Sequence, residues 1–118
     1  MADGYEPRPY TDVWVDVSSD FSPSVTGVSI KAYTNGRLMN MQVGIPKNTA
    51  DATVVAQIPS KYLPKIGLCQ FSGGIYYHQE DFQKIFILAI DTNGDLKFRC
   101  SQVPTGTWGL SFTTVYAF

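Results

Sequence analysis

An Asn-Gly pair inside a stretch of alternating polarity constrains the fold of this chain more than any other feature. Asn35-Gly36 lies at the centre of residues 27–45, and Asn-Gly is the strongest short-range signal for a hairpin, because a type I′ turn needs positive φ at both central residues. With this pair at the tip, apolar side chains share one face and polar side chains the other. The predicted apolar pairs are Ala32 with Met39, Ile30 with Met41 and Val28 with Val43, and the predicted polar pairs are Lys31 with Asn40 and Ser29 with Gln42. This stretch therefore predicts an antiparallel hairpin in an all-β chain.

Short apolar or alternating segments, separated by turn residues, continue along the rest of the chain. They recur at about the 8–12-residue spacing of sandwiches and barrels. Besides the first hairpin, we expect strands at 12–17, 52–58, 66–71, 85–90 and 108–116, and one more after a second Asn-Gly pair. A chain of 118 residues can build one domain with its own core. We predict an antiparallel β-sandwich or barrel, Greek-key or jelly-roll-like, of about eight short strands, with an extended leader at 1–11 and a single domain at 12–118.

The second Asn-Gly pair, Asn93-Gly94, predicts another hairpin whose register stays open. A tip of these two residues alone would set Ala89 opposite Phe98, Ile87 opposite Cys100, Leu88 opposite Arg99 and Phe86 opposite Ser101. A three-residue turn with Gly94 left-handed would shift this register. The strand before the turn, residues 85–90, is apolar on both faces, which is typical of a central strand or of one covered by another subunit.

The charge balance argues against several classes of partner. The chain has nine basic and ten acidic residues with no basic run, and nucleic-acid affinity depends largely on phosphate neutralisation. We expect no nucleic-acid binding. No apolar run approaches the length that spans a bilayer, so we expect no membrane insertion, and no signal peptide is visible at the N-terminus. Cys69 and Cys100 could pair, but two cysteines are no disulfide framework, and we predict free thiols of the core type.

Candidate metal sites are weak in this sequence. His78 is the single histidine, and with Glu80 and Asp81 it could hold a cation, although a solvated loop explains the three residues better. Asp91, Asn93 and Asp95 imitate the start of a calcium loop. However, glycine stands at position 4 of that loop instead of 6, and position 12 is glutamine where a bidentate Glu is needed. The hairpin explains these residues better, and we predict no metal and no cofactor.

Catalytic patterns are equally weak. No second acid is placed against Glu80, whereas a glycosidase needs two carboxyl groups flanking the bond. The chain has no Gly-x-Ser-x-Gly elbow around a nucleophilic serine and no phosphate-binding glycine loop. We therefore predict a protein that is not an enzyme.

Aromatic residues are the remaining candidates for function, because sugar binding needs flat rings for sugar faces and polar groups for hydroxyls. Five such residues follow a Gly-Gly break, and a plain loop is the open alternative for them. They are Tyr76, Tyr77, His78, Gln79 and Glu80. Trp14 and Trp108 add large rings, although each also suits a core or subunit-interface position. We name the five-residue stretch and Trp108 as candidate ligand-binding residues.

The order of several motifs resembles the C-terminal head domains of tail-fibre, baseplate and receptor-binding proteins from phages of Gram-positive bacteria. The motifs are Asn-Gly-Arg-Leu-Met-Asn-Met-Gln-Val-Gly-Ile at 35–45, Ala-Gln-Ile-Pro-Ser-Lys-Tyr-Leu-Pro at 56–64, Ile-Asp-Thr-Asn-Gly-Asp-Leu at 90–96 and Gly-Thr-Trp at 106–108. The resemblance covers roughly residues 25–118. Such proteins usually carry a shoulder, linker or neck before the head, whereas only a short leader precedes Val13 here. We expect an isolated head or a variant of that architecture.

The resemblance implies an antiparallel sandwich or barrel, usually a homotrimer, at the tail tip or baseplate of a virion and made in the host cytoplasm. It implies binding to host cell-wall polysaccharide or teichoic acid. Similar domains also serve as baseplate scaffolds that bind other virion proteins, which is the alternative, and a generic carbohydrate-binding module is third. The resemblance transfers no binding residue, because the ligand loops of this family vary more than its strands.

Overall fold

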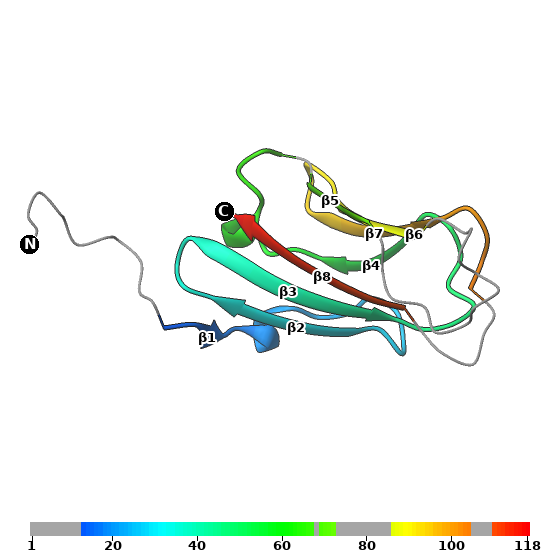
Figure 1. Ribbon diagram of the computed structural model, residues 1–118, viewed down its shortest axis with the longest axis horizontal. Coiled ribbons are helices and arrows are strands. Elements are labelled where there is room, and N and C mark those ends of the chain that lie inside the picture. Colours follow the sequence, from blue (N-terminus) through cyan, green and yellow to red (C-terminus); the bar gives the residue numbers. More distant parts are fainter. Residues whose placement is uncertain (1–12, 68, 73–85, 105–109) are drawn as a thin grey trace, which may run out of the picture.

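The computed structural model describes residues 13–67, 69–72, 86–104 and 110–118, which form an antiparallel β-sandwich (Figure 1). The predicted fold class is confirmed. Sheet A has the order β1-β2-β3-β8, with β1 (Val15–Asp16), β2 (Ser29–Thr34), β3 (Leu38–Ile45) and β8 (Leu110–Ala117). Sheet B has the order β4-β7-β6-β5, with β4 (Thr53–Gln57), β7 (Asp95–Cys100), β6 (Phe86–Ile90) and β5 (Cys69–Ser72). Two short 3-10 helices in the described part, η1 (Ser18–Asp20) and η2 (Ser60–Tyr62), lie in the connections.

The strand order within sheet B is of the Greek-key type. Strands β5, β6 and β7 are neighbours in chain order, and β4 lies on the far side of β7. A meander of three strands with the fourth beside one end of it is the Greek-key arrangement. The chain then returns to sheet A, where β8 pairs with β3 over its whole length. This return makes β8 an edge strand of sheet A, as Figure 1 shows.

The core lies between the inward faces of the two sheets. Phe98 from sheet B and Phe112 from sheet A are almost wholly buried, and their rings meet edge to face with centroids 6.3 Å apart. This contact joins the two layers at their centre. The fully buried side chains around it include Met39, Met41, Val43 and Ile45 of sheet A and Val55, Leu88, Ile90 and Leu96 of sheet B. Alternation of such residues along the strands leaves every second position of each sheet facing outward.

The first hairpin has the predicted faces but not the predicted register. Ala32 pairs with Met41 instead of Met39, which is a shift of two residues. The type I′ prediction is wrong: Gly36 has φ +98°, whereas Asn35 is not left-handed. The Asn35 side-chain oxygen instead accepts hydrogen bonds from the backbone N–H groups of Arg37 and Leu38, at 3.1 and 2.9 Å. This side chain closes a wider tip than the two-residue loop we expected.

The predicted inward and outward faces are correct despite the wrong register, because a two-residue shift equals the side-chain period of a strand. Met41 and Val43 are buried, with Val28 at 8% exposure and Ile30 half-buried beside them. Of the four expected outward residues, Ser29, Lys31 and Gln42 are exposed, whereas Asn40 is half-buried.

The second hairpin has a three-residue turn, which is one of the two alternatives that the sequence allowed. Gly94 is left-handed with φ +91°, and Asp91 donates its N–H to the carbonyl of Asp95 at 2.9 Å. Leu88 consequently pairs with Phe98, not with Arg99 as the two-residue tip would require. The one-residue difference places Leu88 in the core, where it is fully buried.

Strand β6 is a central strand, as one reading of its two apolar faces predicted. On its outward face Ala89 is only 7% exposed and Ile87 is half-buried within the single chain. A partner subunit is therefore not needed to cover this strand.

The two cysteines lie on strands that flank β6. Cys69 pairs with Ile90 and Cys100 pairs with Phe86 through the backbone. Strands two positions apart are separated by roughly 9.5 Å, which exceeds the Cα separation of about 7 Å that a disulfide tolerates. Cys100 is a free, partly buried thiol, and burial raises its pKa.

Candidate functional site

The candidate residues named from the sequence lie outside the described residues. Tyr76, Tyr77, His78, Gln79 and Glu80 fall within 73–85, and Trp108 falls within 105–109. The structure therefore neither brings them together nor separates them. Trp14 is described and is 41% exposed, so it is not a core residue of this chain.

The outward face of sheet A holds the site that the described residues build best. Strand pairing sets its side chains in rows across three strands. One row crosses β2, β3 and β8 as Ser29, Gly44 and Ser111, and the next as Lys31, Gln42 and Thr113. Hydroxyl, amide and ammonium groups therefore occupy neighbouring positions of one regular surface.

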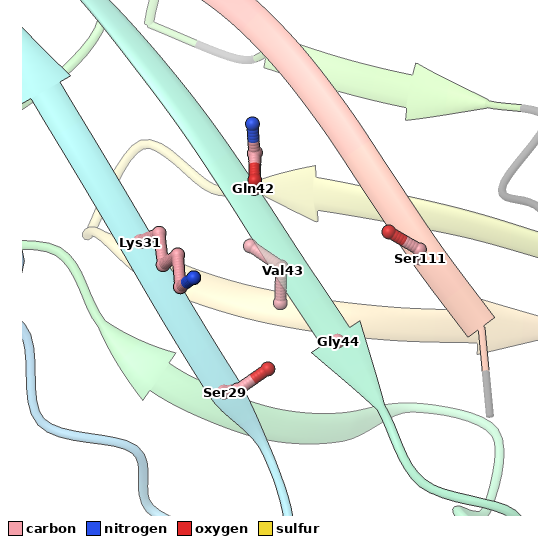
Figure 2. Close-up of a pocket in the computed structure, with 6 residues that line it drawn as sticks. All are labelled: Ser29, Lys31, Gln42, Val43, Gly44 and Ser111. Atoms are coloured by element: carbon pink, nitrogen blue, oxygen red, sulfur yellow. The ribbon is translucent and has the colours of Figure 1, made fainter.

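Gly44 forms the floor of a shallow hollow in this surface. The hollow measures about 130 Å³ and is lined by Ser29, Lys31, Gln42, Val43, Gly44 and Ser111. Figure 2 shows the hydroxyl groups of Ser29 and Ser111 pointing toward β3 from the strands on either side. A Cβ at position 44 would stand 2.5 Å from the Ser29 hydroxyl oxygen. The hollow exists because this position has no side chain.

The backbone does not explain the glycine. Pairing continues without a bulge from Ser29 through Gly44 to Ser111, and Gly44 is not left-handed. A glycine inside a strand otherwise marks a place where a ligand or another backbone approaches closely. Its lack of a side chain costs stability, by about 0.5–1 kcal/mol relative to alanine. Gly44 thus points to close approach at this surface.

The polar groups around the hollow are available to a ligand. Among the described residues Lys31 makes no ion pair. The nearest acid with an electrostatic influence is Asp16, whose pKa is lowered first by the backbone N–H of Ser18, then by its hydroxyl, with a smaller effect of Lys31. The Ser18 N–H donates to Asp16 at 2.9 Å. Asp16 is thus held mainly by its own loop, and Lys31 forms no ion pair with it or with another described acid.

A buried polar atom lies in the row beyond the hollow. Asn40 stands between Tyr33 on β2 and Val115 on β8, and its side-chain oxygen is buried without a hydrogen-bond partner in the described structure. A buried acceptor left unpaired costs about 1–3 kcal/mol. This atom extends the set of unused hydrogen-bonding groups from the hollow toward the tip of the first hairpin.

The outward face of sheet B differs in this respect. Lys97 lies 3.7 Å from Asp91, and the Arg99 guanidinium lies 2.9 Å from Asp51. The backbone N–H of Cys100, followed by Arg99, holds the pKa of Asp51 below its usual value. Both basic groups of this face form ion pairs, whereas Lys31 on sheet A forms none within the described part of the chain.

A third polar cluster closes one end of the sandwich. The Tyr62 hydroxyl donates to Asp20 at 2.7 Å, and Lys61 lies 3.6 Å from the same carboxylate. Burial raises the pKa of Tyr62, and its bond to Asp20 adds to that effect. The Tyr62 ring stacks on Phe21 with centroids 5.6 Å apart. These contacts fasten η1 to η2, and we assign the cluster to stability.

Sequence reasoning predicted the outward position of Ser29, Lys31 and Gln42 but did not recognise them as a site. The missed signal was Gly44, a glycine inside a strand that is otherwise regular. Within the described ranges, no group of three or more His, Cys, Asp or Glu residues could hold a metal ion. The same ranges contain no helix long and apolar enough to cross a membrane.

No protein-family model matches this chain, and a comparison with curated proteins finds no significant match.

Proposed function

We propose that this chain is a non-enzymatic binding domain that recognises saccharide on a bacterial surface, as the head of a phage tail-fibre or baseplate receptor-binding protein. The hollow at Gly44 is the single observation that carries the proposal. It places two serine hydroxyls, an amide and an ammonium that has no ion pair among the described residues around a spot with no side chain. A polymer of hydroxyl-rich units offers the matching donors and acceptors.

The size of the hollow favours one unit of a polymer over a whole enclosed small molecule. Its volume of about 130 Å³ is below the roughly 300–1,000 Å³ of typical small-molecule pockets. A site this shallow binds weakly, and several copies on one assembly would raise avidity by about 10²–10⁴. The resemblance implies a homotrimer at the virion tail tip, and we retain that number as part of the proposal.

Lys31 extends the proposal to anionic polymers. An ammonium that forms no ion pair with the acids the structure describes favours phosphate or carboxylate on the ligand, and hydrogen bonds to charged groups contribute about 1.5–3 kcal/mol. Teichoic acid and phosphate-bearing cell-wall polysaccharide both offer such groups. We therefore place them first among the candidate ligands.

Binding of the purified chain to cell-wall preparations of Gram-positive bacteria tests the proposal. Lys31→Ala combined with Gln42→Ala should weaken binding at least about tenfold, which is roughly 1.4 kcal/mol. Lys47→Ala is the matched control, since Lys47 is an exposed lysine in the turn after β3 and does not line the hollow. Full binding by the double variant would exclude the hollow as the site.

A scaffold role is the second candidate, and a different observation favours it. Three consecutive large apolar side chains are exposed at the start of sheet A: Val13 by 65%, Trp14 by 41% and Val15 by 52%. Successive side chains of an extended segment point to opposite sides, and exposed apolar groups on both sides favour contact with another protein. If no cell-wall preparation binds the chain while purified baseplate proteins capture it, the scaffold role replaces saccharide recognition.

A further inference from the structure

Strand β8 is an edge strand of sheet A, and it is less protected than the other edge strands of this fold. An edge strand offers unpaired N–H and C=O groups to other chains, and proteins protect such edges with short strands, charges, prolines, bulges or covering segments. The two sheets have four edge strands among the described residues: β1, β8, β4 and β5. Three of them carry a protecting feature.

Strand β1 is two residues long and contains Asp16, and β5 is four residues long. Strand β4 has a register shift between Val54 and Ala56. Its free side is covered by a bridge from Pro23 to Ala56 and by the Ser24 N–H, which donates to the Val55 carbonyl at 2.7 Å. These features limit pairing with another chain at all three strands.

Between Leu110 and Tyr116, strand β8 shows none of these features in the described part of the chain, whereas its last residue, Ala117, is covered by the N–H of Lys65. The strand runs for eight residues as Leu-Ser-Phe-Thr-Thr-Val-Tyr-Ala, without a charge or a proline. It pairs with β3 in continuous register from Leu110 to Ala117, without a bulge. A long, regular and uncharged edge of this kind is a predicted pairing site.

Two hydrogen bonds show which backbone groups of β8 face outward. Phe118 donates to Arg37 on the β3 side, whereas the carbonyl of Ala117 accepts from Lys65 on the other side. Since the direction alternates along a strand, Ser111, Thr113 and Val115 also point their N–H and C=O groups away from β3. In the described part of the chain, no residue bonds to these outward groups. The side chains of all three are exposed.

We propose that this edge pairs with the β8 edge of a second copy of the chain, in antiparallel orientation about a two-fold axis at Thr113. In this register Ser111 faces Val115 of the second copy, and Thr113 faces its own counterpart. Each of the three residues exchanges both backbone hydrogen bonds with its partner. No like charges meet, and hydroxyl and β-branched side chains are favourable cross-strand neighbours.

The sequence of β8 favours a second copy of the chain as its pairing partner. A two-fold contact must be self-complementary, because one surface serves both copies. An uncharged strand meets this condition, whereas a charged foreign strand would find no opposite charge on β8.

The pairing has a consequence for the candidate site. A two-fold axis between antiparallel strands stands perpendicular to the sheet, so both outward faces remain on the same side. Ser111 belongs both to the edge and to the hollow. The two hollows would therefore flank the contact on one surface and could bind one polymer together. This consequence rests on the proposed function, but the pairing does not.

The mass of the assembly tests the pairing. We expect light scattering on the full chain to give an even multiple of the 13.1 kDa chain at high concentration. Thr113→Pro should halve that mass. No bond of the outward Thr113 N–H is found among the described residues, so proline removes only the edge donor and is tolerated at such a position. Thr113→Val keeps the backbone donor and the branched side chain, and it should retain the wild-type mass.

Thr113→Lys is a second variant with an independent cause, because it opposes two like charges across the axis. It should also halve the mass, and thermal unfolding checks that each variant is folded. A wild-type mass of one or three chains at every concentration would overturn the proposal. So would an unchanged mass in two folded variants, Thr113→Pro and Thr113→Lys. Loss of a two-fold contact halves the mass of any assembly that is built through it. The test therefore does not depend on the proposed three-fold unit.

Discussion

The hydroxyl of Tyr116 donates a buried hydrogen bond of 2.9 Å to the backbone carbonyl of Tyr62. It joins the last strand of sheet A to the short helix η2 that follows β4. Because the carbonyl would be left without this donor, Tyr116→Phe should lower the free energy of unfolding by about 1–3 kcal/mol. Urea denaturation measures this change.

Tyr33→Phe is the matched control for that measurement. Tyr33 is half-buried on the outward face of sheet A, and no hydrogen bond of its hydroxyl is found in the described part of the chain. We expect a change within about 0.5 kcal/mol, as for other surface substitutions. Equal losses in the two variants would show that the Tyr116 bond does not carry the effect.

Stability should fall in acid through the carboxylates whose pKa values are lowered in the folded chain. The Cys100 N–H and then Arg99 hold the pKa of Asp51 below its usual value. A group with a lowered folded pKa stabilises the fold above its unfolded pKa, and this contribution disappears as pH falls through the folded value. Asp51→Asn should therefore flatten the dependence of the melting temperature on pH below about pH 4. An unchanged acid slope in this variant would contradict the assignment.

Gly44→Ala tests whether the hollow binds a ligand. The backbone allows alanine there, because Gly44 is not left-handed, but the new Cβ would crowd the Ser29 hydroxyl at 2.5 Å. We expect saccharide binding to be lost. The free energy of unfolding should change by no more than about 1 kcal/mol, since removing a strand glycine offsets the crowding.

The double variant Ser29→Ala with Gly44→Ala separates the two effects. Without the hydroxyl the crowding is relieved, so stability should rise above that of Gly44→Ala alone, while the hollow stays filled and binding stays absent. Recovery of binding in the double variant would show that crowding, and not the filled hollow, had caused the loss.

The loop named from the sequence needs a test of its own. Tyr77→Ala with His78→Ala should abolish cell binding only if residues 76–80 form the site. Isothermal titration with the same cell-wall polymer measures both this variant and the Lys31, Gln42 pair. Loss of binding in the loop variant, with full binding in the sheet variant, would show that the loop is the site. Loss of binding in the sheet variant alone would support the site on sheet A.

The alternation of the first hairpin predicted which side chains are buried, since the period of two survives a two-residue error. It did not predict the register, because the Asn35 side chain accepts two backbone N–H groups at the tip. That contact depends on the folded turn and has no separate sequence pattern. The second hairpin stayed open for a related reason: Asn-Gly accepts two-residue and three-residue turns alike, and burial of Leu88 against Phe98 decides between them.

The candidate site on sheet A was not predictable in the same way. Ser29, Gly44 and Ser111 come from three strands, and Ser111 lies 67 positions after Gly44 in the chain. Their meeting depends on β8 returning beside β3, which no local pattern encodes. The position of Gly44 in a regular strand was visible, but its meaning required the neighbours on both sides.

The closed tip of the first hairpin also bears on the chemical ageing of the protein. Asn-Gly sequences deamidate when the glycine nitrogen attacks the asparagine side-chain carbonyl, which makes such asparagines thermolabile. At the first tip the Gly36 N–H is held by the Thr34 hydroxyl at 3.0 Å, and Asn35 is only 6% exposed. At the second tip Asn93 is exposed. Asn35-Gly36 should therefore deamidate more slowly than Asn93-Gly94. The slower dipeptide belongs to the sheet that carries the hollow.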